Sequence, residues 1–254
     1  MSLLPRFPRP LSEAAIWQDV EFGSYAADLP LWEQLAREAG GTVVELGAGS
    51  GRVTLHLARA GYEVLAVERD RELAEELERR GEGLPIHVVA ADFVLADPPW
   101  PQSAPENARL VIAPLQVFQL LDERERCHVL AAVTEVLTSG GRFAVALVDE
   151  TTLAEAGVAA APQPDMRELE GWVYYSEPLW VQVSDRSLRV RRLRERVSPR
   201  GDLVRRVHDD LLHRLSPEQL AEETERAGLR PLERRRVSSG PDEADSVVVL
   251  AERR

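Results

Sequence analysis

The sequence predicts an α/β protein built on a doubly wound, mostly parallel β-sheet, with an antiparallel β insertion after the fifth strand. Between residues 42 and 148, short runs rich in β-branched residues alternate with amphipathic stretches, which is typical of βαβ units. After residue 149, strand-like runs follow one another with only turn residues between them. We therefore expect three segments: an N-terminal helical segment with the α/β core (1–148), a β insertion that acts as a lid (149–214), and a return to the core (215–254).

The composition excludes several classes of protein. The chain has 254 residues, 44% of them hydrophobic, and its 31 basic against 43 acidic side chains give a net charge of −12, so we expect a globular fold with a sizeable core. All the basic residues are arginine, which excludes enzymes that need a lysine, such as pyridoxal phosphate enzymes, Walker-motif NTPases and protein kinases. The acidic excess opposes non-specific binding to nucleic acid or to anionic lipid.

The cysteine content and the hydropathy pattern indicate the cellular environment that we expect for the protein. Cys127 is the only cysteine, so an internal disulfide and a thiolate metal cluster are excluded. The first ten residues contain prolines and arginines where a secretory signal would need an apolar run, and no stretch approaches the roughly 18 apolar residues of a membrane span. We expect a soluble, cytoplasmic protein that does not bind membranes.

The core elements follow from hydrophobic periodicity and capping residues. A helix is expected from about Ser50 to Gly61, a second is capped by Asp70, and a third opens with the capping box of Asp122 and Glu125 and continues to Gly140. Between them we expect five strands at residues 42–46, 62–68, 86–92, 109–113 and 142–148.

The C-terminal half is expected to hold the β insertion and then the last core elements. Ser216 as N-cap and Gln219 three positions later start a helix that ends before Gly228. The insertion strands are expected at 172–176, 179–184, 188–197 and 203–212, and the final core strands at 232–237 and 246–252.

The glycine-rich segment from Glu45 to Gly51 is the most informative motif. It lies where the first strand turns into a helix, so its glycines let the backbone approach a ligand and the helix start offers unpaired N–H groups. The spacing is Gly-x-Gly-x-Gly, because Arg52 stands where a dinucleotide fingerprint has its third glycine. Glu68 ends the second strand, where a carboxylate can accept both hydroxyls of a ribose. The pattern predicts a nucleoside ligand and disfavours NAD.

With these residues the chain resembles the class I S-adenosylmethionine-dependent methyltransferases. The resemblance includes the lead-in 28–32, the glycine loop, and the stretches 90–93, 113–116 and 137–141, which occur in family order. It implies a Rossmann-like sheet with an antiparallel last strand, S-adenosylmethionine as cofactor and S-adenosylhomocysteine as product. The cofactor-binding positions that it implies are Tyr25, Glu45, Gly47, Ala48, Gly49, Gly51, Glu68, Arg69, Asp92, Phe93 and Pro114.

The resemblance also suggests a role for most of these residues. The loop would cradle the methionine end of the cofactor, and Glu68 would bind the ribose hydroxyls. Asp92 would meet the adenine amino group, with Phe93 beside the ring. Glu45 would order the loop and the amino group of the cofactor. Two roles stay open for Tyr25: it could close over the cofactor, or it could be a half-buried structural tyrosine.

The sequence leaves the methyl acceptor and the catalytic residue unknown. Methyl transfer from a sulfonium needs a desolvated, aligned nucleophile and little further help, so we expect transfer to nitrogen or oxygen of a small molecule between the strand ends and the insertion. No metal site is expected. The substrate-side candidates are Gln116, Gln119, Tyr174 and Trp180.

Several alternatives stay open at this point. The same loop could serve a non-catalytic S-adenosylmethionine-binding protein or a nicotinamide oxidoreductase. Asp97 to Trp100 match the Asp-Pro-Pro-aromatic tetrad of nucleic-acid adenine methyltransferases, although here the tetrad precedes the fourth strand instead of ending it. Residues 186–206 carry nine arginines against two acidic residues, which could recognise an anionic substrate or form a solvated face paired with acids. A homodimer is also left open.

Overall fold

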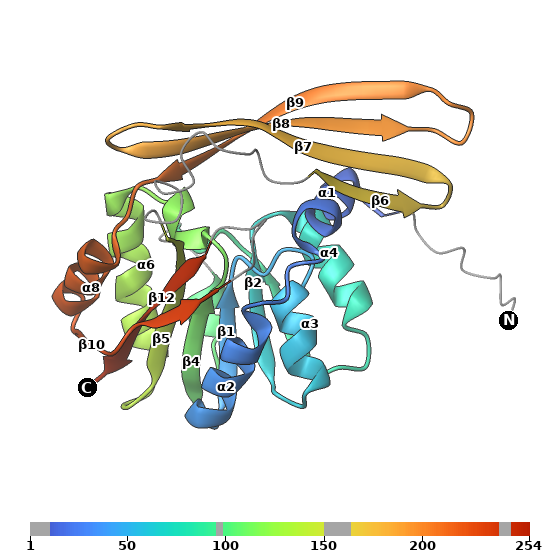
Figure 1. The fold of residues 1–254 in the computed structure, drawn as a ribbon. Helices are drawn as coiled ribbons and strands as arrows, with labels where there is room; N and C mark the ends of the chain where they lie inside the picture. Colours follow the sequence, from blue (N-terminus) through green and yellow to red (C-terminus); the bar gives the residue numbers. More distant parts are fainter. Residues whose placement is uncertain (1–10, 95–98, 150–163, 239–244) are drawn as a thin grey trace, which may run out of the picture.

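A computed structural model describes residues 11–94, 99–149, 164–238 and 245–254, and it confirms the predicted fold class. The main sheet has the order β10-β12-β5-β4-β1-β2-β3 (Figure 1). β1 to β5 are parallel to their neighbours, whereas β12 runs antiparallel to β5. The strands are β1 Thr42–Leu46, β2 Val64–Glu68, β3 Ile86–Ala90, β4 Ala108–Ala113, β5 Arg142–Val148, β10 Leu229–Pro231 and β12 Ser246–Arg253.

Helices cover both faces of this sheet, as a doubly wound fold requires. On one face Trp32 of α2 and Leu57 of α3 pack with β1, β4 and β5, and on the other Val133 of α6 and Leu220 of α8 pack with the same sheet. Among the helices described, none is long and apolar enough to cross a membrane. Their bounds are α1 Glu13–Phe22, α2 Leu29–Ala39, α3 Arg52–Arg59, α4 Arg71–Arg80, α5 Pro99–Ser103, the 3₁₀ turn η1 Val117–Leu120, α6 Glu123–Val136 and α8 Pro217–Arg226.

The predicted caps are present, and the boundary errors have local causes. Asp70 caps α4, and the capping boxes of Asp122 and Ser216 open α6 and α8. The second strand starts at Val64 instead of residue 62, because the Tyr62 N–H donates to the Leu57 carbonyl and closes α3. α6 stops at Val136, four residues before the predicted end, since the next residue is already extended.

Only residues 235–237 of the predicted strand 232–237 form a strand, and another short strand, which was not predicted, precedes that range. Leu229–Pro231 (β10) and Arg235–Val237 (β11) both pair with β12, and between them the Leu232 N–H donates to the Leu250 carbonyl. The chain therefore follows β12 along its edge with one irregular stretch between the two short strands.

The insertion forms a separate four-stranded antiparallel sheet, β6-β7-β8-β9, called here the accessory sheet. Its strands β7 and β9 contact α1 and η1 at the end of the main sheet where the parallel strands finish, and it lies across that end (Figure 1). The two predicted strands 172–176 and 179–184 form a single strand with a bulge at Leu179, and β6 was not predicted. The bounds are β6 Asp165–Leu169, β7 Trp172–Val183, β8 Ser187–Val197 and β9 Leu203–His213.

Candidate functional site

The glycine loop joins β1 to α3 in a conformation that requires glycine. Gly47, Gly49 and Gly51 have φ angles of 70°, 58° and 99°, a region that other residues rarely adopt. A Cβ atom would also meet its neighbours, lying 2.9 Å from a Val117 methyl at Gly47 and 2.3 Å from a Leu77 methyl at Gly51. The loop therefore presents bare backbone at the carboxyl ends of the strands, as the sequence predicts.

Glu68, at the end of β2, binds the glycine loop directly. One carboxylate oxygen accepts the Gly49 N–H at 2.8 Å, and the other accepts the Asp70 N–H at 2.8 Å. Burial raises the pKa of Glu68, and the two N–H donors oppose that rise by stabilising the charged form. The carboxylate is thus held at the loop, and the neighbouring Arg69 is exposed.

Glu45 lies under the loop, fully enclosed between β1 and α3. It accepts a hydrogen bond from the Thr54 hydroxyl of α3. Burial raises the pKa of Glu45 to about 8, and the Thr54 hydrogen bond and the nearby Arg52 charge only partly offset this. The side chain ties the first strand to the helix that follows the loop, which agrees with the loop-ordering part of its expected role.

The other implied cofactor residues follow β3 and β4 at the same edge of the sheet. The Asp92 carboxylate accepts the Val94 N–H at 2.9 Å, so it shapes the turn after β3, and Phe93 is buried against the core. After β4, Pro114 is buried and Leu115 has a φ of 49°, which turns the chain sharply at the strand end. Because parallel strands present their carboxyl ends at one edge, the four strand ends form one continuous rim.

Tyr25 lies in the connection before α2 and is fixed from the loop side. The Arg52 guanidinium donates to the Tyr25 carbonyl at 2.9 Å and lies 5.0 Å from the centre of its ring. The ring is half-buried. Both alternatives given for this residue at the sequence level are compatible with that position.

The sequence did not single out α1, although this helix contacts the glycine loop. Gln18 Oε1 accepts the Ser50 N–H at 2.8 Å, and the Ser50 hydroxyl donates to Asp19 at 3.1 Å. Arg80 of α4 binds Asp19 with two hydrogen bonds of 2.8 and 2.6 Å. The sequence predicts a helical segment here, and Ser12 caps the helix, but neither feature reports these distant contacts.

The substrate-side candidates occupy different places. Tyr174 is buried and meets Trp17 of α1 edge-on, with ring centres 5.6 Å apart. Trp180 follows the bulge at Leu179, which turns it to the opposite face of the accessory sheet, where Arg191 lies 4.8 Å from its ring. Trp180 therefore cannot line a pocket together with Tyr174.

The two glutamines after β4 also differ. Gln116 is half-buried in the turn that precedes η1. Gln119 is fully buried, and its Oε1 accepts the Val148 N–H at 2.8 Å, so it fastens η1 to the end of β5. Gln116 is the better placed of the two to reach a ligand, because the side chain of Gln119 is enclosed by protein.

The arginine-rich stretch 186–206 is extensively ion-paired. Arg194 binds Glu21 of α1 with two hydrogen bonds of 2.7 Å, Arg191 binds Asp209 at 2.6 Å, and Arg206 lies 3.1 Å from Glu13. These contacts favour the interpretation of this stretch as a face paired with acids. Among the described residues, no three His, Cys, Asp or Glu side chains gather as metal ligands.

The Asp-Pro-Pro-Trp tetrad does not present an aromatic ring to a base. Asp97 and Pro98 lie outside the described residues, whereas Trp100 in α5 is fully buried in the main core. β4 ends at Ala113, so the tetrad lies before this strand and not at its carboxyl end.

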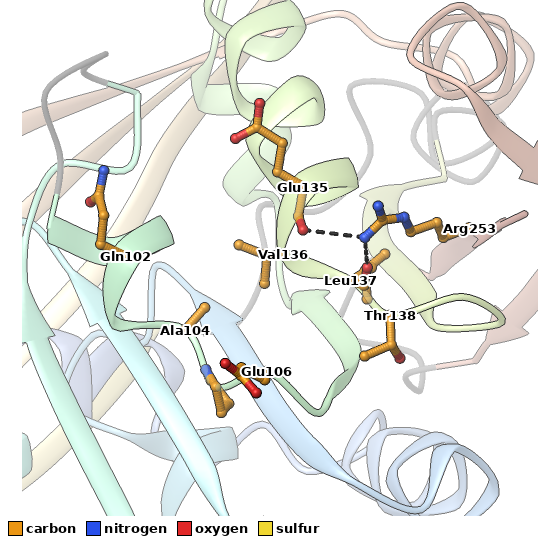
Figure 2. Close-up of a pocket in the computed structure, with 9 residues that line it drawn as sticks. Gln102, Ala104, Glu106, Glu135, Val136, Leu137, Thr138 and Arg253 are labelled. Carbon is orange, nitrogen blue, oxygen red and sulfur yellow. Dashed lines mark hydrogen bonds between the residues drawn. The ribbon is translucent and has the colours of Figure 1, made fainter.

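A cavity of about 410 Å³ lies away from the residues expected to bind cofactor (Figure 2). Its lining residues come from the segment before β4, from the end of α6 and from Arg253. The Arg253 guanidinium donates to the carbonyls of Glu135 (3.2 Å) and Leu137. The lining contains none of the residues expected to bind cofactor. It lies where β4 begins, and hence opposite the rim that holds the glycine loop.

Comparison with known proteins supports the interpretation of the rim. Residues 43–141 match a family model described as a methyltransferase domain. The dimethyladenosine transferase of Schizosaccharomyces pombe is 33% identical over 87 residues, covering 33% of this chain and 28% of that protein. A probable dimethyladenosine transferase of Drosophila melanogaster is 31% identical over 121 residues, covering 43% of this chain and 40% of its own length. The chain thus spans less than half the length of these curated relatives.

Solved structures match nearly the whole chain. The sugar N-methyltransferase KedS8 from Streptoalloteichus aligns with a TM-score of 0.75 and 16% identity over 100% of this chain and 98% of its own. The glycopeptide N-methyltransferase MtfA in complex with S-adenosylmethionine aligns with a TM-score of 0.60 and 22% identity over 93% and 90% of the two chains. Residues 43–141 thus match a methyltransferase domain, and the chain has the fold of solved S-adenosylmethionine-dependent methyltransferases.

Proposed function

We propose that this protein is an S-adenosylmethionine-dependent methyltransferase that methylates nitrogen or oxygen of a small molecule. The observation that carries the proposal is the junction of the glycine loop with Glu68. There, three glycines with positive φ leave bare backbone, and a buried carboxylate is held against Gly49. A nucleoside suits this combination, because its ribose hydroxyls can donate to the carboxylate.

The residues present fit this cofactor. Glu68 would accept from the ribose hydroxyls, Asp92 would accept from the adenine amino group, and the glycine loop would admit the methionine end. The cofactor supplies a methyl group bonded to a positively charged sulfur. The chain's own contribution is to align the acceptor and exclude water, for which no acid or base of the protein is required. The catalytic residue accordingly stays unassigned.

The small-molecule acceptor is supported by the position of the accessory sheet. The sheet lies across the rim where an acceptor would enter, and it contacts α1 and η1 (Figure 1). The net charge of −12 opposes binding to a phosphate backbone. The sugar and glycopeptide N-methyltransferases that share the fold have acceptors of this size class in their names.

Methylation of adenine in ribosomal RNA is the second candidate, because some curated relatives are named dimethyladenosine transferases and another is named a ribosomal RNA small subunit methyltransferase. The segments matched to the two dimethyladenosine transferases cover 33% and 43% of this chain, and Trp100 is buried. A panel of amino sugars, glycopeptide amines, phenols and rRNA, with S-adenosylhomocysteine formation as the readout, separates the two candidates. Binding without any turnover would instead favour a non-catalytic cofactor-binding protein.

Cofactor binding is tested with Gly49→Ala. The substitution places a methyl group 2.2 Å from Gln18 Oε1, so it should displace the Gln18 amide, narrow the space over the loop backbone and weaken calorimetric binding of S-adenosylhomocysteine by at least tenfold. Gly83→Ala is the matched control, because Gly83 also has a positive φ (81°) but no atom lies within 4 Å of its Cβ position. Wild-type protein that binds NAD, or binds neither S-adenosylmethionine nor S-adenosylhomocysteine, contradicts the proposal.

A further inference from the structure

α1 lies between the glycine loop and the accessory sheet (Figure 1). Trp17 and Glu21 contact β7 and β8 of the accessory sheet. Gln18 and Asp19 contact the loop and α4. The helix is therefore the one described segment that bonds to the loop from outside the main sheet.

The Gln18 carboxamide lies against the loop backbone at Gly49. Its Oε1 accepts the Ser50 N–H at 2.8 Å, and a Cβ on Gly49 would lie 2.2 Å from Oε1 and 2.7 Å from Nε2. The N–H donor at Ser50 fixes which end of the amide is oxygen, because only the oxygen can accept. Nε2, which makes no hydrogen bond to the described residues, is thereby oriented as a donor beside Gly49.

Two partly buried ionic contacts hold the helix that carries this side chain. Asp19, the next residue, is bound by both Arg80 and Ser50 on the core side. Glu21 is bound by Arg194 and by the Ser176 hydroxyl at 2.7 Å on the side of the accessory sheet, and its own side chain is only 2% exposed. Gln18 is thus carried by a helix that is anchored on both sides of it.

The chemistry around the loop calls for a donor at this position. Glu68 and Asp19 can only accept hydrogen bonds while ionised, and the Gly49 N–H is already used by Glu68. These acceptors suit the hydroxyl and ammonium groups of S-adenosylmethionine, but its carboxylate needs N–H donors. Gln18 offers two such donors without a competing charge.

We propose, on the basis of the function proposed above, that Gln18 is a cofactor-binding residue that recognises the carboxylate at the methionine end. Its Oε1 stays anchored on the Ser50 N–H, and its Nε2 donates to the carboxylate. Asp19 and Glu21 act as positioning residues, because they fix the helix that carries Gln18. α1 then links cofactor recognition to the placement of the accessory sheet over the acceptor side.

The test compares two ligands that differ at the recognised group. S-adenosylhomocysteine has the amino acid end, whereas 5′-methylthioadenosine keeps the adenosine and the sulfur but lacks it. By calorimetry, Gln18→Ala should weaken S-adenosylhomocysteine about tenfold, the effect of losing one hydrogen bond to a charged group, and change methylthioadenosine by less than about twofold. Gln18→Glu should weaken S-adenosylhomocysteine further, because it sets a carboxylate against a carboxylate, and again spare methylthioadenosine.

The control is Gln34→Ala, the same substitution at an exposed glutamine of α2 that bonds only to Glu38; it should change neither affinity. Equal losses of both ligands in Gln18→Ala would show that Gln18 acts on the ribose or through the loop, and would overturn the proposal. Unchanged or tighter S-adenosylhomocysteine binding would overturn it as well. If the wild-type protein binds neither ligand, the proposed function fails together with this inference. If the wild-type protein binds S-adenosylhomocysteine and Gln18→Ala binds it equally well, only this inference fails.

Discussion

Arg52 binds Asp28 through two hydrogen bonds of 2.6 and 2.7 Å, so the residue after the glycine loop is fastened to the start of α2. The Trp32 indole N–H donates to the same carboxylate at 2.8 Å. Both carboxylate oxygens of Asp28 therefore accept hydrogen bonds from these partners, and the side chain does not cap α2. This explains why the third glycine of a dinucleotide fingerprint is replaced here by arginine, and why aspartate and tryptophan occur together in the lead-in.

Asp28→Asn should destabilise the protein by about 3 kcal/mol, because it leaves the Arg52 charge without its partner in a mostly buried position. Urea unfolding followed by circular dichroism measures the loss. Asp185→Asn, in an exposed turn of the accessory sheet, is the control and should stay within about 0.5 kcal/mol of wild type. Equal stability of the two variants would mean that the Arg52 pair contributes nothing to folding.

Glu45→Gln should make folding stability less dependent on pH. The folded pKa of Glu45 is raised from 4.5 to about 8 by burial, so its contribution is fully present below pH 4.5 and is lost as the pH rises through 8. Relative to wild type, the variant should therefore gain about 4 °C or more in melting temperature between pH 5 and pH 8. A difference that stays constant with pH would show that Glu45 titrates normally.

Glu223→Gln should be one of the more damaging single changes outside the site. Arg126 of α6 donates to both oxygens of Glu223 of α8 at 2.8 and 2.7 Å, and both side chains are nearly inaccessible. Removing one charge from such a pair costs about 3–5 kcal/mol. Glu123→Gln is the matched control, since Glu123 pairs with Arg226 at 3.8 Å on the exposed surface of the same two helices; it should cost under about 1 kcal/mol.

The sequence predicts those parts of the fold that depend on local chemistry. The fifth strand matches its predicted bounds of 142–148, and the capping residues of α4, α6 and α8 are confirmed, because capping depends on residues within three positions. The glycine loop is also readable locally, since positive φ angles at close spacing leave few residues to choose from.

Contacts between distant segments could not be predicted from the sequence. Gln18 bonds to Ser50 across 32 positions and Arg194 bonds to Glu21 across 173, and no periodicity within α1 reports either contact. The same holds for Gln119, whose hydrogen bond to Val148 becomes visible only when η1 is seen beside β5. The conformation of the glycine loop was therefore predictable from its motif, whereas the contacts of α1 and η1 were not.

The extra residue at Leu179 divides β7 into two halves whose alternation is offset by one. Near the core, Tyr174 and Ser176 point toward α1, and beyond the bulge the odd-numbered positions take over that side while Trp180 is turned outward to Arg191. Removing Leu179 would restore a single alternation and exchange the two surfaces of the outer hairpin without altering any other residue. The unpaired residue Leu179 thus determines which side chains at the far end of β7 face solvent and which face the rest of the protein.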